Sequence, residues 1–207
     1  AEQWDHAQTV MEKILKDLDV NYESGLDEAA FYGPKLDIQY KNVYGKEDTI
    51  VTIQIDMLLA EKFGMEYIDV DGTRKRPYII HRTSLGCYER TLAMLIEKYA
   101  GAFPLWLAPE QVRFIPIADR HLPFVREIAE KLEALGIRCS IDDRAEKMGY
   151  KIRQAQLEKT PYMLIAGDNE VESKTVSVRS RRDGDLGSMT PAELIERLTD
   201  EIVSKKI

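Results

Sequence analysis

The first hundred residues combine helical periods with alternating, strand-like runs. Apolar and polar positions alternate over residues 35–43 and 49–57, and a Tyr44-Gly45-Lys46 turn separates the two runs, which predicts an antiparallel hairpin. A second hairpin is predicted from 66–70 and 76–82. Helices are predicted where apolar residues recur every three or four positions, at 3–18 and 86–99.

The pattern changes in the second half, where single strands alternate with helices. Strands are predicted at 112–117, 137–141, 162–166 and 176–178, and helices at 122–135, at 149–157 and from Pro191 onward. The last helix begins with a Thr190–Glu193 capping box. Strand–helix alternation predicts parallel pairing with helices on the faces of the sheet. The second half is therefore predicted to be α/β, and the first half α+β.

A segment with glycine and proline, residues 101–109, separates the two halves. Its aromatic residues Phe103 and Trp106 are unlike those of a flexible linker, so we expect them to pack across the junction. The predicted domains are accordingly residues 1–104 and 105–207.

Composition excludes several functional classes. The 207 residues include 29 basic and 36 acidic ones, a formal charge of −7, which argues against a DNA-binding protein held by net charge but permits a local basic face for RNA. No apolar run is long enough to span a membrane. Two cysteines do not make a disulfide framework, so a reducing, cytoplasmic location is expected. Phosphate-loop, dinucleotide-binding, Cys-x-x-Cys and serine-hydrolase signatures are missing.

Two segments of the first half carry candidate chemistry. His81 ends a predicted strand, Gly86 permits a close turn, and Arg90 opposes the helix dipole in the next helical turn, which indicates a bound anion. Lys35 follows a rigid Gly33-Pro34 turn and is placed to meet phosphate or carboxylate. The alternative readings are a hydrogen-bonded histidine, an arginine paired with a nearby acid, and a surface lysine.

A basic face is predicted in the second half. Tyr150 and Tyr162 lie among its bases, an arrangement that suits stacking on unpaired RNA bases. The bases are Arg144, Lys147, Lys151, Arg153, Lys159, Arg179, Arg181 and Arg182. A solvated charged surface is the alternative.

Six segments, in order, resemble the threonyl-tRNA synthetase family of class II aminoacyl-tRNA synthetases over essentially the whole chain. They are AFYGPKLD (30–37), TIQID (52–56), IIHRTSLGCYERTLAMLIE (79–97), FPLWLAPEQV (103–112), DDRAEKMGYKIRQAQLEKTPYMLIAGDNEVES (142–173) and TVSVRSRR (175–182). The Tyr-Gly-Pro-Lys box favours this family over the prolyl, glycyl and histidyl enzymes. The implied fold is part of the class II antiparallel sheet with its motif 3 helix, followed by a three-layer α/β anticodon-binding domain with a mixed sheet.

For the first domain the resemblance implies a site for ATP, with Mg²⁺, and for threonine. Arg90 is similar to the motif 3 arginine that holds the ATP triphosphate, and Lys35 to a lysine on the ATP side. Tyr32 and Gln54 are similar to residues of the amino-acid pocket. Cys87 is assigned to the same site, at a position where serine is common.

The resemblance also implies a metal site and an RNA site. His81 is similar to the last of three ligands of a Zn²⁺ ion that takes the amino and hydroxyl groups of threonine. The anticodon of tRNA(Thr) would be read at four positions: Arg153, Lys159, Glu170 and Arg179. The expected partners are threonine and tRNA(Thr), with a homodimer for the full-length enzyme and neither DNA nor a membrane.

The chain also departs from the family pattern. Motifs 1 and 2 and the other two zinc ligands have no counterpart in this sequence. Thr49-Ile50-Val51 stands where Gln-Cys-Gly is usual, and in the second domain Ala145 and Lys159 replace a frequent asparagine and a frequent arginine. We therefore expect the C-terminal part of a threonine–tRNA ligase, an excised piece or proteolytic fragment that is inactive alone and exposes a sheet edge. The alternatives are a free-standing tRNA-binding or regulatory module without catalysis, and a related synthetase of prolyl or glycyl type.

Overall fold

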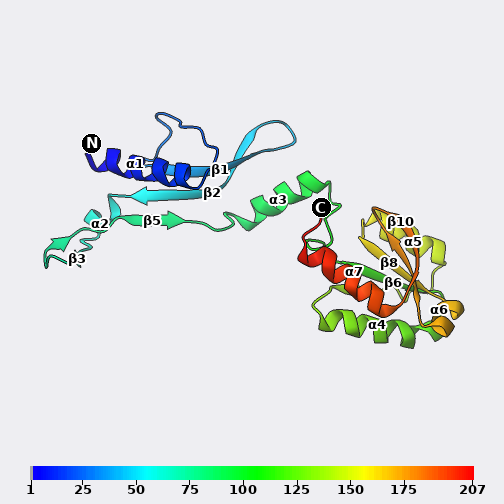
Figure 1. Cartoon of the computed structure of the whole chain (residues 1–207). Coiled ribbons are helices and arrows are strands. Elements are labelled where there is room, and N and C mark those ends of the chain that lie inside the picture. Colours follow the sequence, from blue (N-terminus) through cyan, green and yellow to red (C-terminus); the bar gives the residue numbers. More distant parts are fainter. Residues whose placement is uncertain (1) are drawn as a thin grey trace. The chain divides into compact units, whose positions relative to one another are not determined.

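The computed structural model describes residues 2–207 and separates into two compact units, which divide between Met94 and Leu95 (Figure 1). The helix α3 runs across this division. None of the helices within the described residues is both long and apolar enough to cross a membrane.

The first unit is an antiparallel sheet with short helices. Its elements, with the helix that leaves it, are α1 (Glu2–Asp17), β1 (Lys35–Lys41), β2 (Glu47–Asp56), α2 (Leu59–Lys62), β3 (Tyr67–Ile68), β4 (Arg74–Lys75), β5 (Ile79–Arg82) and α3 (Tyr88–Tyr99). The main sheet has the strand order β1-β2-β5, so the predicted first hairpin is confirmed. A β-bulge places Ile50 between the partners of Ile38 and Gln39. Among the described residues β1 and β5 each keep one unpaired edge, as expected.

The second predicted hairpin differs from the observed one. Only the short strands β3 and β4 pair with each other, while Ile79–Arg82 leaves the hairpin and pairs with β2. Pro77 interrupts the run because proline has no N–H to donate to a sheet ladder. The edge of β2 then offers the unpaired backbone groups that β5 satisfies.

The second unit is a five-stranded mixed sheet between helices. Its elements are β6 (Val112–Pro116), η1 (Asp119–His121), α4 (Leu122–Ala134), β7 (Cys139–Ile141), α5 (Met148–Leu157), β8 (Tyr162–Ala166), α6 (Asp168–Ser173), β9 (Val176–Ser180), β10 (Gly184–Met189) and α7 (Pro191–Val203). The strand order is β10-β9-β8-β6-β7. Strand β6 pairs in parallel with β7 and β8, and the pairs β8–β9 and β9–β10 are antiparallel. The mixed sheet is thus confirmed.

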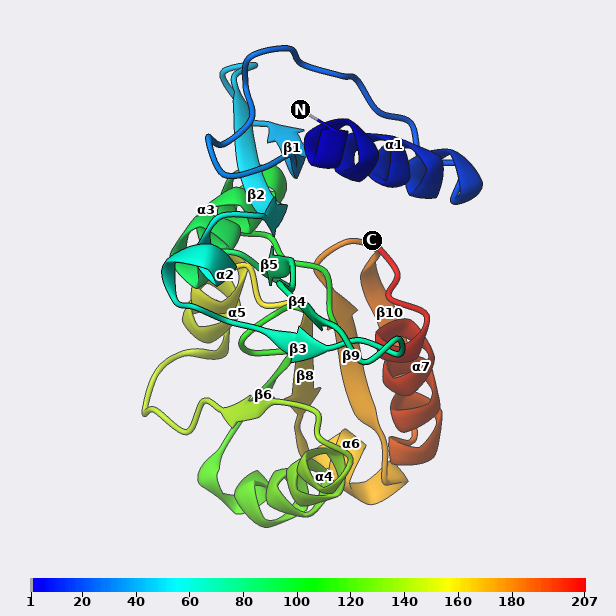
Figure 2. The same ribbon diagram turned by 90° about the vertical axis from the view of Figure 1, so that its left-hand side faces the viewer.

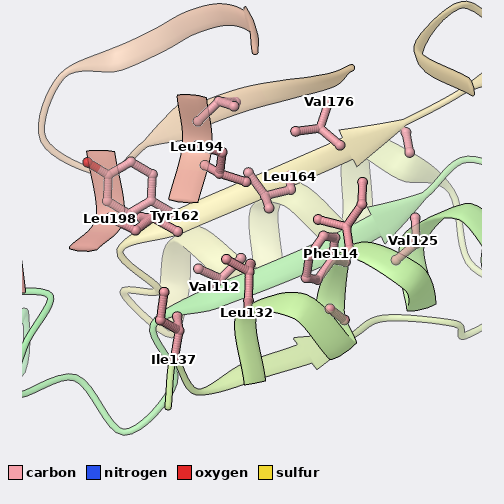
Figure 3. Packing of buried hydrophobic residues seen from close by; sticks show 14 of the residues in the cluster. Val112, Phe114, Val125, Leu132, Ile137, Tyr162, Leu164, Val176, Leu194 and Leu198 are labelled. Atoms are coloured by element: carbon pink, nitrogen blue, oxygen red, sulfur yellow. The ribbon is translucent and has the colours of Figure 1, made fainter. Parts of the chain in front are cut away.

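The apolar side chains of alternate strand positions divide between two faces of this sheet. Phe114 of β6 and Leu164 of β8 pack with α4 and α7 in the larger core (Figure 3). The neighbouring residues Ile115 and Met163 face the opposite side and pack against Ala155 of α5. This period of two produces the predicted three layers. Helix α7 lies alongside β10 (Figure 2).

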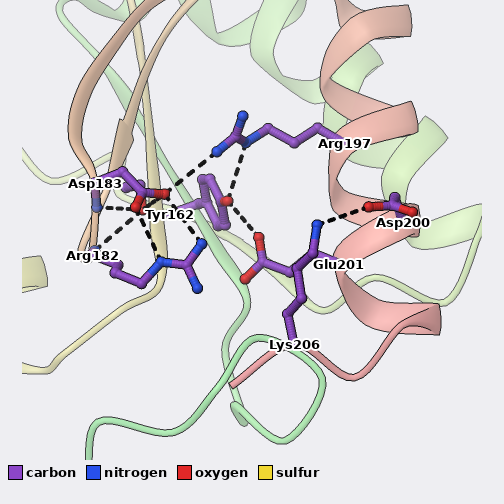
Figure 4. Close-up of polar contacts among 8 residues, drawn as sticks. Tyr162, Arg182, Asp183, Arg197, Asp200, Glu201 and Lys206 are labelled. Carbon is purple, nitrogen blue, oxygen red and sulfur yellow. Dashed lines mark hydrogen bonds and ion pairs between the residues drawn. The ribbon is translucent and has the colours of Figure 1, made fainter.

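Polar contacts also hold α7 to the sheet (Figure 4). The buried hydroxyl of Tyr162, at the start of β8, donates to Glu201 at 2.6 Å and accepts from Arg197 at 3.3 Å. Arg197 reaches Asp183 at 3.4 Å, and Asp183 also pairs with Arg182. The C-terminal half of α7 is therefore joined both to β8 and to the turn after β9.

Candidate functional site

A cavity of about 340 Å³ opens in the first unit. It is lined by Phe31, Tyr32, Gln54, Asp56, Leu58, Leu59, Lys62 and His81. The register of the sheet creates it, because Gln54 of β2 lies directly opposite His81 of β5. The hydroxyl of Tyr32 donates to Gln54 Oε1 at 2.8 Å, which fixes the phenol beside the amide. Three predicted site residues are thus brought together.

Asp56 is a site residue that sequence reasoning missed. Its side chain is buried; Oδ1 accepts from the N–H groups of Leu58 and Leu59, at 2.9 Å each, and Oδ2 lies 3.0 Å from His81 Nε2. Burial alone raises the pKa of this carboxyl, but the hydrogen bonds from Leu59, His81 and Leu58 together lower it below its ordinary value. Asp56 therefore lines the cavity as a carboxylate whose oxygens are bonded to Leu58, Leu59 and His81. Its spacing of two from Gln54 on one strand was the available signal.

His81 does not have the surroundings of a metal site within residues 2–207. No group of three His, Cys, Asp or Glu side chains in that part of the chain is arranged to hold a metal ion. His81 and Asp56 supply two donors, fewer than the three or four protein ligands that zinc takes. The described residues therefore do not fit a zinc ion by themselves.

The other three predicted residues of the first domain lie outside this cavity. Arg90 donates to the carbonyl of Thr49 at 3.0 Å. Lys35 is paired with Asp37 at 2.6 Å, and Cys87, which is exposed, donates to Glu89 at 2.9 Å. None of the three lines the cavity, although Lys35 of β1 lies directly opposite the cavity residue Gln54 of β2.

A second cavity, of about 270 Å³, lies in the second unit at the carboxyl ends of β6 and β7. It is lined by residues 116–119, by 143–147 and by Lys151. Lys151 is buried and donates to the carbonyl of Asp142 at 2.8 Å. Arg144 pairs with both carboxylate oxygens of Asp142, at 2.8 and 2.7 Å, and lies over the ring of Tyr150. This edge of a parallel pair is where open α/β sheets bind ligands.

The four predicted anticodon readers are distributed over several elements and do not line this cavity. Arg153 lies on α5, and Arg179 of β9 is 3.9 Å from Asp185. Glu170 accepts from the N–H of Gly167 at 2.8 Å and from Ser177 at 2.9 Å, so it caps α6. Lys159 contacts the carbonyl of Ala100.

Next to Glu170, Asp168 joins α6 to η1. It pairs with both Arg120, at 2.8 and 2.6 Å, and the buried His121, at 2.8 Å. The Arg120 guanidinium, and after it His121, hold the pKa of Asp168 well below its usual range. The free energy that this lowered pKa contributes to folding is complete above the unfolded pKa of aspartate, near 4, and is lost as the pH falls through the lower folded value.

We accordingly expect Asp168→Asn to weaken the dependence of stability on pH in the acid range. The variant should be less stable than the wild type at pH 7, and the difference should shrink steadily between about pH 5 and pH 2. Urea unfolding at a series of pH values measures this. Asp119→Asn, a change of the same charge at a nearby exposed position, serves as the control. Equal pH profiles for wild type and Asp168→Asn would contradict the assignment.

Comparisons with known proteins agree with this two-part architecture. A family model described as the tRNA synthetase class II core domain (G, H, P, S and T) matches residues 1–99, and an anticodon-binding domain model matches residues 111–201. Together they account for the first unit with α3 and for the sheet of the second unit.

Individual relatives point the same way. Threonine–tRNA ligases from Clostridium perfringens and Natranaerobius thermophilus are 57% and 51% identical to this chain over 205 and 199 residues, which are 99% and 96% of the chain and 32% and 31% of those proteins. The RNA-binding domain of threonyl-tRNA synthetase from Cryptosporidium parvum superposes with a TM-score of 0.84 at 31% identity, covering 97% of this chain and 51% of that one. The chain spans about a third of the length of the curated relatives it matches. It therefore belongs to the threonyl-tRNA synthetase family and corresponds to the C-terminal region, the end of the class II core followed by the anticodon-binding domain.

Proposed function

We propose that this chain supplies the anticodon-reading domain and the motif 3 side of the active site of a threonine–tRNA ligase. The ligase reacts threonine with ATP to give threonyl adenylate and pyrophosphate, and then transfers the threonyl group to the terminal ribose of tRNA(Thr), with release of AMP. The observation that carries this proposal is the match, at 57% identity over 99% of the chain, to relatives named threonine–tRNA ligase. We place the boundary of the two domains between residues 104 and 105, in the interval that neither family model covers.

The cavity of the first unit suits threonine. The Asp56 carboxylate and the Gln54 amide can accept from an ammonium and a hydroxyl group, and Tyr32 orients the amide. Valine has no hydroxyl, so it would leave a buried polar partner unsatisfied, which is the stronger form of discrimination. In this proposal Zn²⁺ at His81 would require ligands that residues 2–207 do not supply, and no step is assigned to it.

The triphosphate of ATP, with Mg²⁺, is assigned to Arg90 and Lys35. Both are cations whose present partners, the Thr49 carbonyl and Asp37, are groups of the first unit that phosphate oxygens would replace. Cys87 precedes α3 and is assigned to the same side. A homodimer and a cytoplasmic location for the whole enzyme complete the proposal.

Anticodon recognition is assigned to Arg153, Glu170 and Arg179, together with the cavity at Lys151, whose lining mixes the bases Arg144, Lys147 and Lys151 with three acids. The lysine and arginine side chains attract the phosphates of the RNA. The carboxylate of Glu170 and the guanidinium of Arg179 would accept and donate hydrogen bonds at the edges of the bases. Glu170 is fixed by Gly167 and Ser177, so its orientation is set before RNA arrives.

We predict that the chain binds tRNA(Thr) at least about tenfold more tightly than the same tRNA with changed anticodon bases, a difference of roughly 1.4 kcal/mol. Arg179→Gln should abolish this difference. Arg126→Gln removes the same charge from an exposed position on α4 and should preserve it. Competitive binding at several salt concentrations separates base readout from phosphate attraction, which falls steeply with salt. Equal affinities of the wild type for both RNAs would contradict the anticodon assignment. They would also contradict the alternative that the chain is a free-standing module that reads the anticodon.

A further inference from the structure

The segment that follows α3 is fastened to the second unit through its backbone carbonyls. Ala100 and Gly101 have positive φ angles, 48° and 76°, and end the helix. Lys159 donates to the carbonyl of Ala100 and lies across Gly101, where an added Cβ would be 3.7 Å from its Nζ. Arg181 Nη2 donates to the carbonyls of Ala102, at 3.1 Å, and Phe103, at 2.6 Å.

The same type of contact continues along the segment. Gln111, which is buried, donates to the carbonyl of Leu105 at 2.9 Å. Arg138 donates to the carbonyls of Trp106, at 3.2 Å, and Ala108, at 2.7 and 3.0 Å. The segment, including the residues before 105 that the proposed domain boundary leaves with the first domain, is therefore held to the second unit and is not a flexible linker.

Lys159 and Arg181 also contact each other, because Arg181 Nη1 donates to the carbonyl of Lys159. Lys159 has a φ of 61° and lies two residues after the last residue of α5. Arg181 follows directly after β9, where its own N–H donates to the carbonyl of Pro161 at 2.8 Å. Burial removes the guanidinium of Arg181 from water and thereby lowers its pKa. Both cations are thus directed to the protein backbone.

The elements that precede these two cations in the chain carry predicted RNA contacts. Arg153 lies on α5, six residues before Lys159, and Arg179 lies on β9, two residues before Arg181. Arg179 is a residue of β9 and Arg181 is the first residue after that strand, so only Ser180 separates them along the chain. At the other end of the segment, α3 is one continuous helix whose first turn carries Arg90.

We propose that Lys159 and Arg181 are positioning residues that fix the end of α3 to the anticodon-binding unit, so that RNA held by α5 and β9 restrains α3. The inference builds on the proposed function and reassigns Lys159 from an RNA contact to a tether. Two observations support it: the hydrogen bonds that hold residues 100–103 within the second unit, and the continuity of α3.

Hydrogen exchange with mass spectrometry on the whole chain tests this, with and without tRNA(Thr). The reporters are the amides of Gly101 and Ala102, which bond to Ile96 and Tyr99. In the wild type, RNA should slow their exchange. In Arg181→Gln and Lys159→Met, exchange should be about tenfold faster and RNA should no longer slow it, while tRNA affinity stays within about twofold. Arg126→Gln, which removes an exposed cation of α4 outside the predicted basic face, should behave as the wild type.

Distinct results overturn the inference. A tenfold loss of tRNA affinity in Lys159→Met with unchanged exchange at Gly101 and Ala102 would make Lys159 an RNA contact. Binding of RNA to the wild type without slower exchange at these amides would reject the coupling. If the wild type fails to distinguish anticodons, the proposed function fails, but exchange in the free variants still decides whether the tether exists. If Arg181→Gln also loses protection in β6, Arg181→Lys is used in its place. Lysine keeps the charge but has a single nitrogen, so it cannot reproduce the bonds that the two terminal nitrogens of Arg181 make, and the same faster exchange at Gly101 and Ala102 is expected.

Discussion

Replacing Leu164 with alanine is expected to lower the free energy of unfolding of the second unit by about 2–5 kcal/mol. Leu164 is completely buried in β8, which has a strand on each side and helices α4 and α7 over the Leu164 face. Close packing around β8 allows little collapse, so the substitution removes transfer free energy and also leaves a cavity. The effect is a large share of the stability of a domain of this size.

Urea unfolding followed by tryptophan fluorescence measures this loss. A Trp4→Phe background leaves Trp106, in the second unit, as the reporter. Leu157→Ala makes the same change of side chain on α5 at a position that is 62% exposed, and we expect it to stay within about 0.5 kcal/mol of the parent. Similar losses for the two variants would show that β8 is not the centre of the core.

The second large effect is expected for Gly86→Ala. Gly86 has a φ of 66°, and a Cβ placed on it would lie 1.9 Å from the carbonyl oxygen of Ile50, the bulged residue of β2. Alanine is strained in the left-handed conformation, and its Cβ must also displace the backbone at Ile50. Each of these effects costs about 1–3 kcal/mol, so the free energy of unfolding should fall by about 3 kcal/mol or more. The displaced segment joins β5 to α3, and with it His81 to Arg90.

Gly45→Ala is the matched control, because its φ is 77° but no atom lies within 4 Å of the added Cβ. It should cost only the conformational term, about 1 kcal/mol. Fluorescence of Trp4, in a Trp106→Phe background, follows unfolding of the first unit, and hydrogen exchange of β2 reports the local change. Equal losses at the two glycines would refute the close contact between Gly86 and Ile50.

Hydrophobic period and turn chemistry were sufficient for most elements. The Lys35–Asp56 hairpin, α4 and the Thr190-capped α7 are specified by residues close together in the chain, so local patterns identify them. The second hairpin was wrong in part because the partner of residues 79–82 depends on which edge of β2 is free. Strand β10, rich in glycine, has weak strand propensity and forms by pairing with the open edge of β9.

The candidate site shows the same division. Motifs located Tyr32, Gln54 and His81, and a strand register brings them together. The sequence by itself determined the family, the order of the two domains and the residue types available for chemistry. The tertiary structure decided that Asp56 is a buried acceptor. It also decided that Lys159 and Arg181, two bases among many, donate hydrogen bonds to carbonyls of the segment after α3. The reason is physical: periodicity reports which face of an element is apolar, whereas the partner of a polar group depends on the donors and acceptors that folding leaves unpaired nearby.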